Sequence, residues 1–410
     1  MKLYHWRPGF ISKMQPYSIY LHIPFCVHRC AYCDFNTYAG LDDLIEPYTQ
    51  ALCNEIKIIG QSGQARFNTR IPVHTIFFGG GTPSLLNLSQ LNRIFLALHK
   101  EFDLLPKIEI TLEANPGTVS HSYLEGLVNL GVNRLSLGMQ TSNPLELKLL
   151  ERQHAAEDVI NSVKWARQAG LSNLNLDLIF GLPSQSLASW LNTLHFALSL
   201  KPSHLAIYSL TLEHGTPLAH WVDRGLLSEP DNNLAASMYE HTMDIMEQNG
   251  YTQYEISNWS KSVVDSDSFA CKHNLQYWRG LPWLGLGAGA HGYIPGCRTV
   301  NHLAPTAYIR RLHSASSIDS FPQSPATAEM RTLSMDDERG EYMMMALRLT
   351  DEGVSNQEFK HRFGQSLNQA YERQIKRLIK RNLLEWYGID RIRLTRPGRL
   401  LGNQVFMEFI

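Results

Sequence analysis

Short apolar runs alternate with amphipathic segments along the first half of the chain. The runs predict six strands, over residues 18–23, 73–78, 108–112, 134–138, 174–179 and 204–210. Between them, hydrophobic residues recur at helical spacing and predict helices over 44–59, 88–102, 122–130, 157–169 and 189–200. Such alternation is typical of parallel βαβ units. We therefore expect an α/β fold, a partial (β/α)6 TIM-like barrel, with functional side chains where the strands end.

The pattern changes after Leu312. Ser and Pro occupy seven positions between Ser314 and Pro325, and this composition predicts a linker over 313–335. Three further helices are predicted over 338–349, 356–363 and 367–381, and the apolar segments 392–394 and 405–407 predict a small hairpin. We expect a barrel domain with an N-terminal extension over 1–312, the linker, and a winged-helix-like α+β domain over 336–410.

Composition narrows the class of protein. The chain has 410 residues, of which 44% are hydrophobic and 18% charged, so it can bury a large core and is neither disordered nor fibrous. The formal charge of −1 provides no global field for nucleic acid. Between Tyr371 and Leu400 basic residues outnumber acidic ones nine to three, but a solvated helix face explains this excess better than nucleic-acid binding.

No membrane-spanning or secretory segment is expected. The first 15 residues lack the apolar core of a signal peptide, and nowhere do about 18 apolar residues run unbroken. These features predict a cytoplasmic protein. Any membrane contact is expected to be a peripheral encounter with a partner.

Three of the six cysteines lie in one short loop after the first predicted strand. Cys26, Cys30 and Cys33 are spaced four and three residues apart. Soft thiolate ligands select zinc or an iron–sulfur cluster. A structural zinc ion normally has four protein ligands, and here His22 or His28 would have to supply the fourth. Three thiolates on a [4Fe–4S] cluster would leave one iron open to a small molecule.

This Cys-x-x-x-Cys-x-x-Cys loop resembles that of the radical S-adenosylmethionine (SAM) superfamily. The resemblance implies a [4Fe–4S] cluster on the three cysteines, whose open iron binds the amino and carboxylate groups of SAM. It also implies an electron donor, because the reduced cluster cleaves the sulfonium bond of SAM in that family. Tyr32 has the aromatic character that the family places beside the adenine.

Further residues at strand ends match the oxygen-independent coproporphyrinogen oxidase group of this superfamily. A glycine-rich turn follows the second strand, Glu113 ends the third, and other polar residues end or follow later βα units. Taken alone, the turn and each polar residue have ordinary structural explanations. The resemblance implies SAM contacts from Tyr20, Tyr32, Gly80, Gly81, Thr82, Glu113, Gln140, Arg152 and Asp177.

Two features separate members of the group. The coproporphyrinogen dehydrogenases have a fourth cysteine two residues after the third, where this chain has Phe35. The segment His273-Asn-Leu-Gln-Tyr277-Trp278 resembles the HNxxYW signature of HemW-type heme chaperones, which bind heme and deliver it to acceptor proteins. His273 could then offer an imidazole to heme iron, although a hydrogen-bonded core corner is the more common role for such a residue.

Three functions remain open from the sequence. The resemblance to heme chaperones implies heme and heme-acceptor proteins as partners, with no catalytic residue assigned. The alternative is an oxidoreductase of porphyrin biosynthesis, a radical-SAM coproporphyrinogen III decarboxylase. A DNA-binding regulator has only the local basic excess in its favour, and no nucleic acid is expected as a partner.

Overall fold

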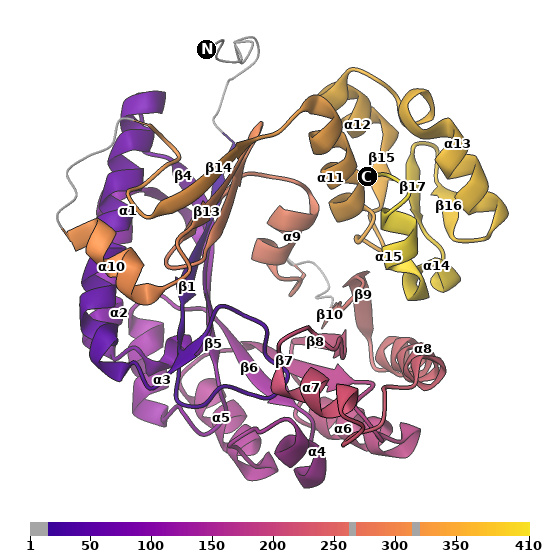
Figure 1. The fold of residues 1–410 in the computed structure, drawn as a ribbon, viewed down its shortest axis with the longest axis horizontal. Helices are drawn as coiled ribbons and strands as arrows, with labels where there is room; N and C mark the ends of the chain where they lie inside the picture. Colours follow the sequence, from indigo (N-terminus) through magenta and orange to yellow (C-terminus); the bar gives the residue numbers. More distant parts are fainter. Residues whose placement is uncertain (1–14, 262–267, 314–319) are drawn as a thin grey trace.

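The computed structural model describes residues 15–261, 268–313 and 320–410. All six predicted strands of the barrel are confirmed, and the α/β class with them (Figure 1). They are β1 (Tyr17–Ile23), β4 (Pro72–Gly80), β5 (Asp103–Ala114), β6 (Arg134–Gln140), β7 (Asn173–Phe180) and β8 (His204–Ser209). The helices over the outer face are α1 (Ile45–Phe67), α2 (Leu88–Glu101), α3 (His121–Asn129), α5 (Ala156–Gln168) and α6 (Leu187–Ser199).

These strands lie side by side in chain order, all parallel, and do not close into a complete barrel. Beyond β8 the sheet continues with β10 (Asn258–Lys261) and β9 (Tyr251–Glu255), both antiparallel additions. Beyond β1 it continues with β11 (Trp283–Leu286), β12 (His291–Ile294), β13 (Cys297–Asn301) and β14 (Thr327–Thr332). Strand β14 falls within the range expected to be a linker. Its side chains are mostly exposed, so it shows no hydrophobic pattern in the sequence.

Burial on both faces of the sheet explains why the parallel strands can be predicted from the sequence. All seven residues of β6 are buried, and β1 and β7 are buried except for one or two positions. Parallel sheets covered on both faces give near-continuous apolar runs. The polar residues inside such runs are therefore informative, because each needs a partner in the interior.

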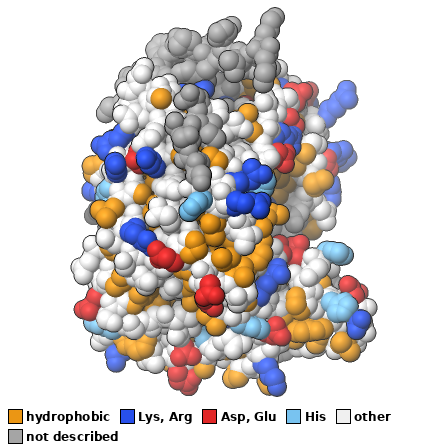
Figure 2. Space-filling view, turned by 60° about the vertical axis from the view of Figure 1, so that its left-hand side comes forward, with side chains coloured by type: hydrophobic (Ala, Val, Ile, Leu, Met, Phe, Trp, Pro, Cys, Tyr) orange, Lys and Arg blue, Asp and Glu red, His pale blue; other side chains and the backbone are white. Residues whose placement is uncertain are grey.

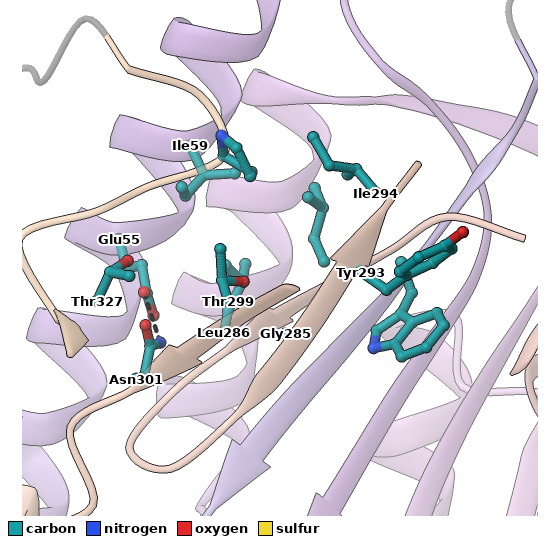
Figure 3. A pocket seen from close by; sticks show the side chains of 12 residues that line it. Glu55, Ile59, Gly285, Leu286, Tyr293, Ile294, Thr299, Asn301 and Thr327 are labelled. Carbon is teal, nitrogen blue, oxygen red and sulfur yellow. Dashed lines mark hydrogen bonds between the residues drawn. The ribbon is translucent and has the colours of Figure 1, made fainter. Parts of the chain in front are cut away.

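The buried carboxylate of Glu55 joins the part of the sheet from β11 to β14 to helix α1. Figure 3 shows it reaching toward Asn301. Its two oxygens accept hydrogen bonds from Gly287 N (2.8 Å), Asn301 Nδ2 (2.8 Å), Tyr308 Oη (2.6 Å) and Ser324 Oγ (2.7 Å). Tyr308 belongs to α10 (Pro305–His313), which packs on α1. Four separate segments are thus held by one side chain.

The C-terminal domain has a hydrophobic core of its own. Its elements are α11 (Met335–Ala346), β15 (Val354–Ser355), α12 (Asn356–Phe363), α13 (Leu367–Lys380), β16 (Leu384–Tyr387), β17 (Arg391–Leu394), α14 (Arg396–Leu400) and α15 (Gly402–Phe406). The hairpin is β16–β17, so the expected pairing of 392–394 with 405–407 is wrong. Thr395 caps α14 through its side chain, and the chain after β17 turns into two short helices instead of returning as a strand.

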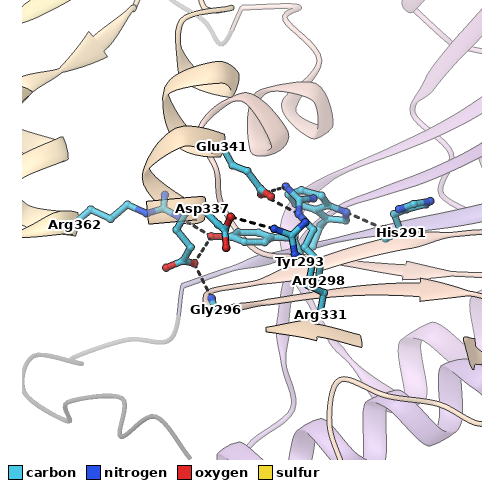
Figure 4. A network of polar contacts seen from close by, with 10 residues as sticks. His291, Tyr293, Gly296, Arg298, Arg331, Asp337, Glu341 and Arg362 are labelled. Atoms are coloured by element: carbon cyan, nitrogen blue, oxygen red, sulfur yellow. Dashed lines mark hydrogen bonds and ion pairs between the residues drawn. The ribbon is translucent and has the colours of Figure 1, made fainter. Parts of the chain in front are cut away.

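Polar contacts join the C-terminal domain to the antiparallel edge of the barrel (Figure 4). Arg298 of β13 donates two hydrogen bonds to Glu341 of α11, at 2.6 and 3.0 Å. Its guanidinium also lies about 5 Å from the ring centres of Trp283 and Tyr293. Arg362 of α12 donates a hydrogen bond to the hydroxyl of Tyr293 at 2.7 Å. The domain is therefore docked against the barrel.

The surface is mixed in character. On the face shown in Figure 2, acidic and basic side chains are interspersed, and hydrophobic side chains gather in one central area. Within the ranges that the structure describes, no helix has the length and apolar character required to cross a bilayer.

Glu55→Gln should lower the free energy of unfolding by about 2 kcal/mol. The amide nitrogen of Gln would replace one carboxylate oxygen, and it could not accept the hydrogen bonds that the buried donors offer. Urea denaturation would measure the change. Glu46→Gln is the matched control, since Glu46 lies on the same helix but forms an exposed ion pair with Arg93. Equal losses in the two variants would contradict this role for Glu55.

Candidate functional site

The loop that bears the three cysteines is pinned to the glycine-rich turn after β4. Gly81 N donates to the carbonyl of Ile23 and Thr82 N to that of Phe25, both at 2.8 Å. A Cβ on Gly81 would lie 2.6 Å from the Phe25 carbonyl oxygen and 3.0 Å from Cys26 Sγ. Only glycine permits so close an approach. The turn therefore fixes the position of the first cysteine.

The far side of the loop is anchored as firmly. Ala31, between the second and third cysteines, is fully buried. Its amide donates to the carbonyl of Leu150, just after α4 (Pro144–Leu149), and its carbonyl accepts from Leu218 N of α7 (Pro217–Asp223). Short strands β2 (Phe25–Cys26) and β3 (Tyr38–Ala39) close the base of the loop. These contacts hold the loop against the ends of the barrel strands.

The cysteines face a cavity of about 380 Å³ at the carboxyl ends of the parallel strands. The structure brings together eleven of the thirteen predicted site residues. All eleven line this cavity: Cys26, Cys30, Tyr32, Cys33, Gly80, Gly81, Thr82, Glu113, Gln140, Arg152 and Asp177. Phe35 also lines this cavity, with its side chain 64% exposed. An apolar side chain thus stands beside the third cysteine.

Each thiol in the loop has a polar neighbour. Thr82 Oγ1 lies 3.6 Å from Cys26 Sγ, and Thr37 Oγ1 lies 3.8 Å from Cys33 Sγ. Arg152 Nη1 donates to Cys30 Sγ at 3.4 Å. Burial raises the pKa of the Cys26 thiol, and the hydrogen bond from Thr82 opposes this shift.

Two arginines line the cavity, and Arg152 is less exposed than the other, Arg29. Arg152 Nη2 donates to Asn115 Oδ1 and to the carbonyl of Gly138, both at 2.6 Å. Its Nε is buried and has no hydrogen-bond partner among the described residues. A guanidinium held in place by these hydrogen bonds at the cavity wall is suited to bind a carboxylate.

Two partly buried carboxylates, Glu113 and Asp177, face the same cavity. Glu113 accepts a hydrogen bond from Gly80 N at 3.2 Å, and Asp177 accepts one from Asn175 Nδ2 at 2.6 Å. Burial, with the charge of Asp177 adding to it, raises the pKa of Glu113 to about 8. Burial also raises the pKa of Asp177. Both groups would be stabilised by a cation or by hydrogen-bond donors on a ligand.

The two remaining predicted residues, Tyr20 and His273, do not line this cavity. The hydroxyl of Tyr20 lies 3.0 Å from His22 Nδ1, and its ring packs beside Gly79. His273 belongs to α9 (Lys272–Trp278) and is 1% exposed. Its Nδ1 lies 2.8 Å from Thr75 Oγ1 and its Nε2 2.7 Å from Tyr277 Oη. Both ring nitrogens are therefore engaged, which favours the hydrogen-bonded core corner over an iron ligand.

Comparisons with known proteins identify the family. Residues 20–197 match the family model described as the radical SAM superfamily, and residues 333–401 match the HemN C-terminal domain. The heme chaperone HemW of Bacillus subtilis is 38% identical over 395 residues, which cover 96% of this chain and 99% of that protein. The chain belongs to the HemW family of the radical SAM superfamily. The Lactococcus lactis HemW is 37% identical over 396 residues, covering 97% and 98%.

A solved structure has the same fold over most of both chains. Coproporphyrinogen III oxidase HemN from Escherichia coli, a radical SAM enzyme, matches with a TM-score of 0.79 at 23% identity. The match covers 96% of this chain and 90% of HemN. At this identity the likeness shows a common fold, the partial barrel with its C-terminal domain.

Sequence reasoning missed the residues that support the cavity in this HemW-family chain. Asn115 directly follows β5 and bonds both Arg152 and Thr82. Its position at the end of a strand is the sequence feature that could have indicated this role. Ser136 and Asn175 bond Asp177 from within otherwise apolar strands. A polar residue inside a buried run was their signal.

Glu113→Gln should remove part of the pH dependence of stability. The folded-state pKa of Glu113, about 8, lies above its ordinary value of 4.5, so the folded chain holds this proton more tightly than the unfolded chain. Its contribution is full below about pH 4.5 and is lost as the pH rises through about 8.

Between about pH 6 and 9, the wild-type chain without iron or SAM should therefore lose more unfolding free energy than Glu113→Gln. Urea denaturation at the two pH values measures the difference. Glu157→Gln, an exposed carboxyl on α5, should behave as the wild type. Equal losses in the wild type and Glu113→Gln would contradict the raised pKa.

Proposed function

We propose that this chain is a heme chaperone, which binds heme and passes it to acceptor proteins. The observation that supports this most strongly is the full-length similarity to proteins named heme chaperone HemW. Phe35 supports it too, because its side chain cannot act as the additional metal ligand at that position. Heme and its acceptor proteins are the partners that follow from this proposal, within the cytoplasm or at a membrane surface reached peripherally.

We further propose that Cys26, Cys30 and Cys33 hold a [4Fe–4S] cluster. The three thiols face one cavity, and the glycine-rich turn leaves space beside Cys26 that a Cβ would fill. Thiolates are the ligands that such clusters prefer. When bound, the cluster would supply single electrons, received from an external donor. The protein residues would fix its position and limit its contact with water.

The same cavity fits SAM in its polar chemistry. Arg152 would bind the SAM carboxylate, while Glu113 and Asp177 would accept hydrogen bonds from the amine and the ribose. Tyr32 would pack against the adenine, and Gly80, Gly81, Thr82 and Gln140 would line the remaining path. Tyr20 would contribute indirectly, through the glycine-rich turn, because its ring packs on Gly79. A heme contact by His273 stays a prediction.

Cys30→Ala should abolish the charge-transfer absorbance of the cluster after anaerobic reconstitution, because two thiolates hold a four-iron cluster poorly. Iron analysis and the visible spectrum measure the loss. Cys297→Ala is the control, since Cys297 lies in β13, outside the cavity, and should leave the spectrum unchanged. Retention of about four irons per chain in Cys30→Ala would overturn the ligand assignment.

One assay distinguishes the chaperone from a decarboxylase. The reconstituted protein would be reduced with SAM present and tested in parallel for heme retention and for conversion of coproporphyrinogen III to protoporphyrinogen IX. We expect stoichiometric heme and no porphyrin product. Formation of protoporphyrinogen IX without heme retention would overturn the chaperone proposal and place the chain among the decarboxylases.

A further inference from the structure

A second cavity, of about 710 Å³, lies between the barrel and the C-terminal domain. The barrel contributes β7, β8, α8 (Asn232–Gln248) and the turn after β9, and the C-terminal domain contributes Arg348 and residues of α14 and α15. Its volume falls in the range typical of small-molecule sites, which favour such domain boundaries. Ser209, where β8 ends, lines both this cavity and the cysteine cavity. The two sites are neighbours.

Two arginines from the C-terminal domain, Arg348 and Arg399, line this second cavity. The charge of Glu255 acts on Arg348 and that of Asp351 acts on Arg399. Arg399 Nη1 donates only to the amide oxygen of Gln253, at 2.8 Å. Burial lowers the pKa of both guanidinium groups. An anionic ligand would supply what they lack.

The nearby carboxylates compensate for the burial of the arginines only in part. Glu255 is buried and its charge acts on Arg348, while its Oε1 accepts hydrogen bonds from Ser257 N and the Asn258 side chain. The charge of Asp351 acts on Arg399, but within the described structure Asp351 accepts no hydrogen bond from Arg399. Two cations whose burial is only partly compensated therefore remain in the cavity wall.

The rest of the wall combines apolar residues with six polar ones: Ser209, Asn232, Asn233, Ser257, Asn403 and Gln404. Phe180, Ile207 and Tyr239 form the barrel side, and Leu400 and Leu401 face them from the C-terminal domain. The rings of Phe180 and Tyr239 are stacked, with centres 6.2 Å apart. No His, Cys or Met is among the residues that line the cavity. The wall thus suits a flat apolar ligand that bears anionic groups and is recognised without a bond to a metal.

The HNxxYW segment connects to this second cavity through Arg348. The Arg348 guanidinium lies between the rings of Trp278 and Phe406, 5.1 and 5.0 Å from their centres. Trp278 ends α9, and Glu109 fixes the start of that helix by accepting hydrogen bonds from Lys272 N and His273 N, both at 3.1 Å. The segment therefore sets the position of an arginine in the cavity.

We propose that the second cavity binds heme, with Arg348 and Arg399 receiving the two propionates and Trp278 acting as a positioning residue for Arg348. This inference rests on the proposed function. The apolar part of the wall would contact the porphyrin ring, as a hydrophobic pocket does for other flat ligands.

Titration of heme into the purified full chain, followed by its Soret absorbance, tests the proposal. Arg348→Met and Arg399→Met should each weaken binding about tenfold, and together about 100-fold, because each removes one charge-assisted contact. Heme dimethyl ester, which has no free carboxylate, should bind the wild type and both variants equally. Arg396→Met is the control, since Arg396 pairs with Asp244 and does not line the cavity.

Two further variants guard against a folding defect and test the positioning role. Asn233→Glu places a negative charge in the cavity wall within the first turn of α8, where an acid stabilises the helix, and should weaken heme binding several-fold. Trp278→Leu should weaken heme binding, and adding it to Arg348→Met should cause no further loss.

The outcomes separate the two proposals. Tight heme binding by the wild type that none of the cavity variants changes would overturn this site and leave the chaperone function standing. Equal weakening of heme and its dimethyl ester would overturn the role of the arginines. A wild-type chain that does not bind heme would overturn the site and the proposed function together.

Discussion

The close backbone contact between the cysteine loop and the glycine-rich turn is the constraint on which the site depends. Two amides of the turn, Gly81 and Thr82, bond carbonyls of the loop, and the missing Cβ of Gly81 leaves room for Cys26 Sγ. The loop has little regular structure of its own, so these bonds replace the packing that a helix or strand would provide. The glycine-rich turn lies at the end of β4. The position of the cysteine loop is therefore tied to the sheet.

The sequence could predict the barrel and the cysteine cavity because both follow local rules. Buried parallel strands give continuous apolar runs, and their carboxyl ends meet at one edge of the sheet. The sequence alone therefore predicts that Glu113 and Asp177 lie together, and both line the cysteine cavity. The antiparallel edge was not predicted, since β14 is exposed along most of its length and has no apolar periodicity.

The role of His273 shows what the sequence could not provide. From its place in the HNxxYW segment a core corner is the more common role, but an iron ligand stays open, and only tertiary contacts decide between them. Thr75 comes from β4 and Tyr277 from the next turn of α9, and together they engage both nitrogens. Burial also lowers the pKa of His273 to about 3, so a neutral imidazole is built into this corner.

The second cavity cannot be predicted from the sequence either. Its two arginines come from separate elements of one domain, and its aromatic wall comes from the other domain. No spacing in the sequence brings Trp278 to Arg348; the docking of the C-terminal domain does, with Arg298 and Glu341 at one edge. Since Ser209 borders both cavities, a ligand in one lies next to a ligand in the other. A shift in the docking of this domain would alter the arginines of the second cavity and leave the cysteine loop, held by β4, in place.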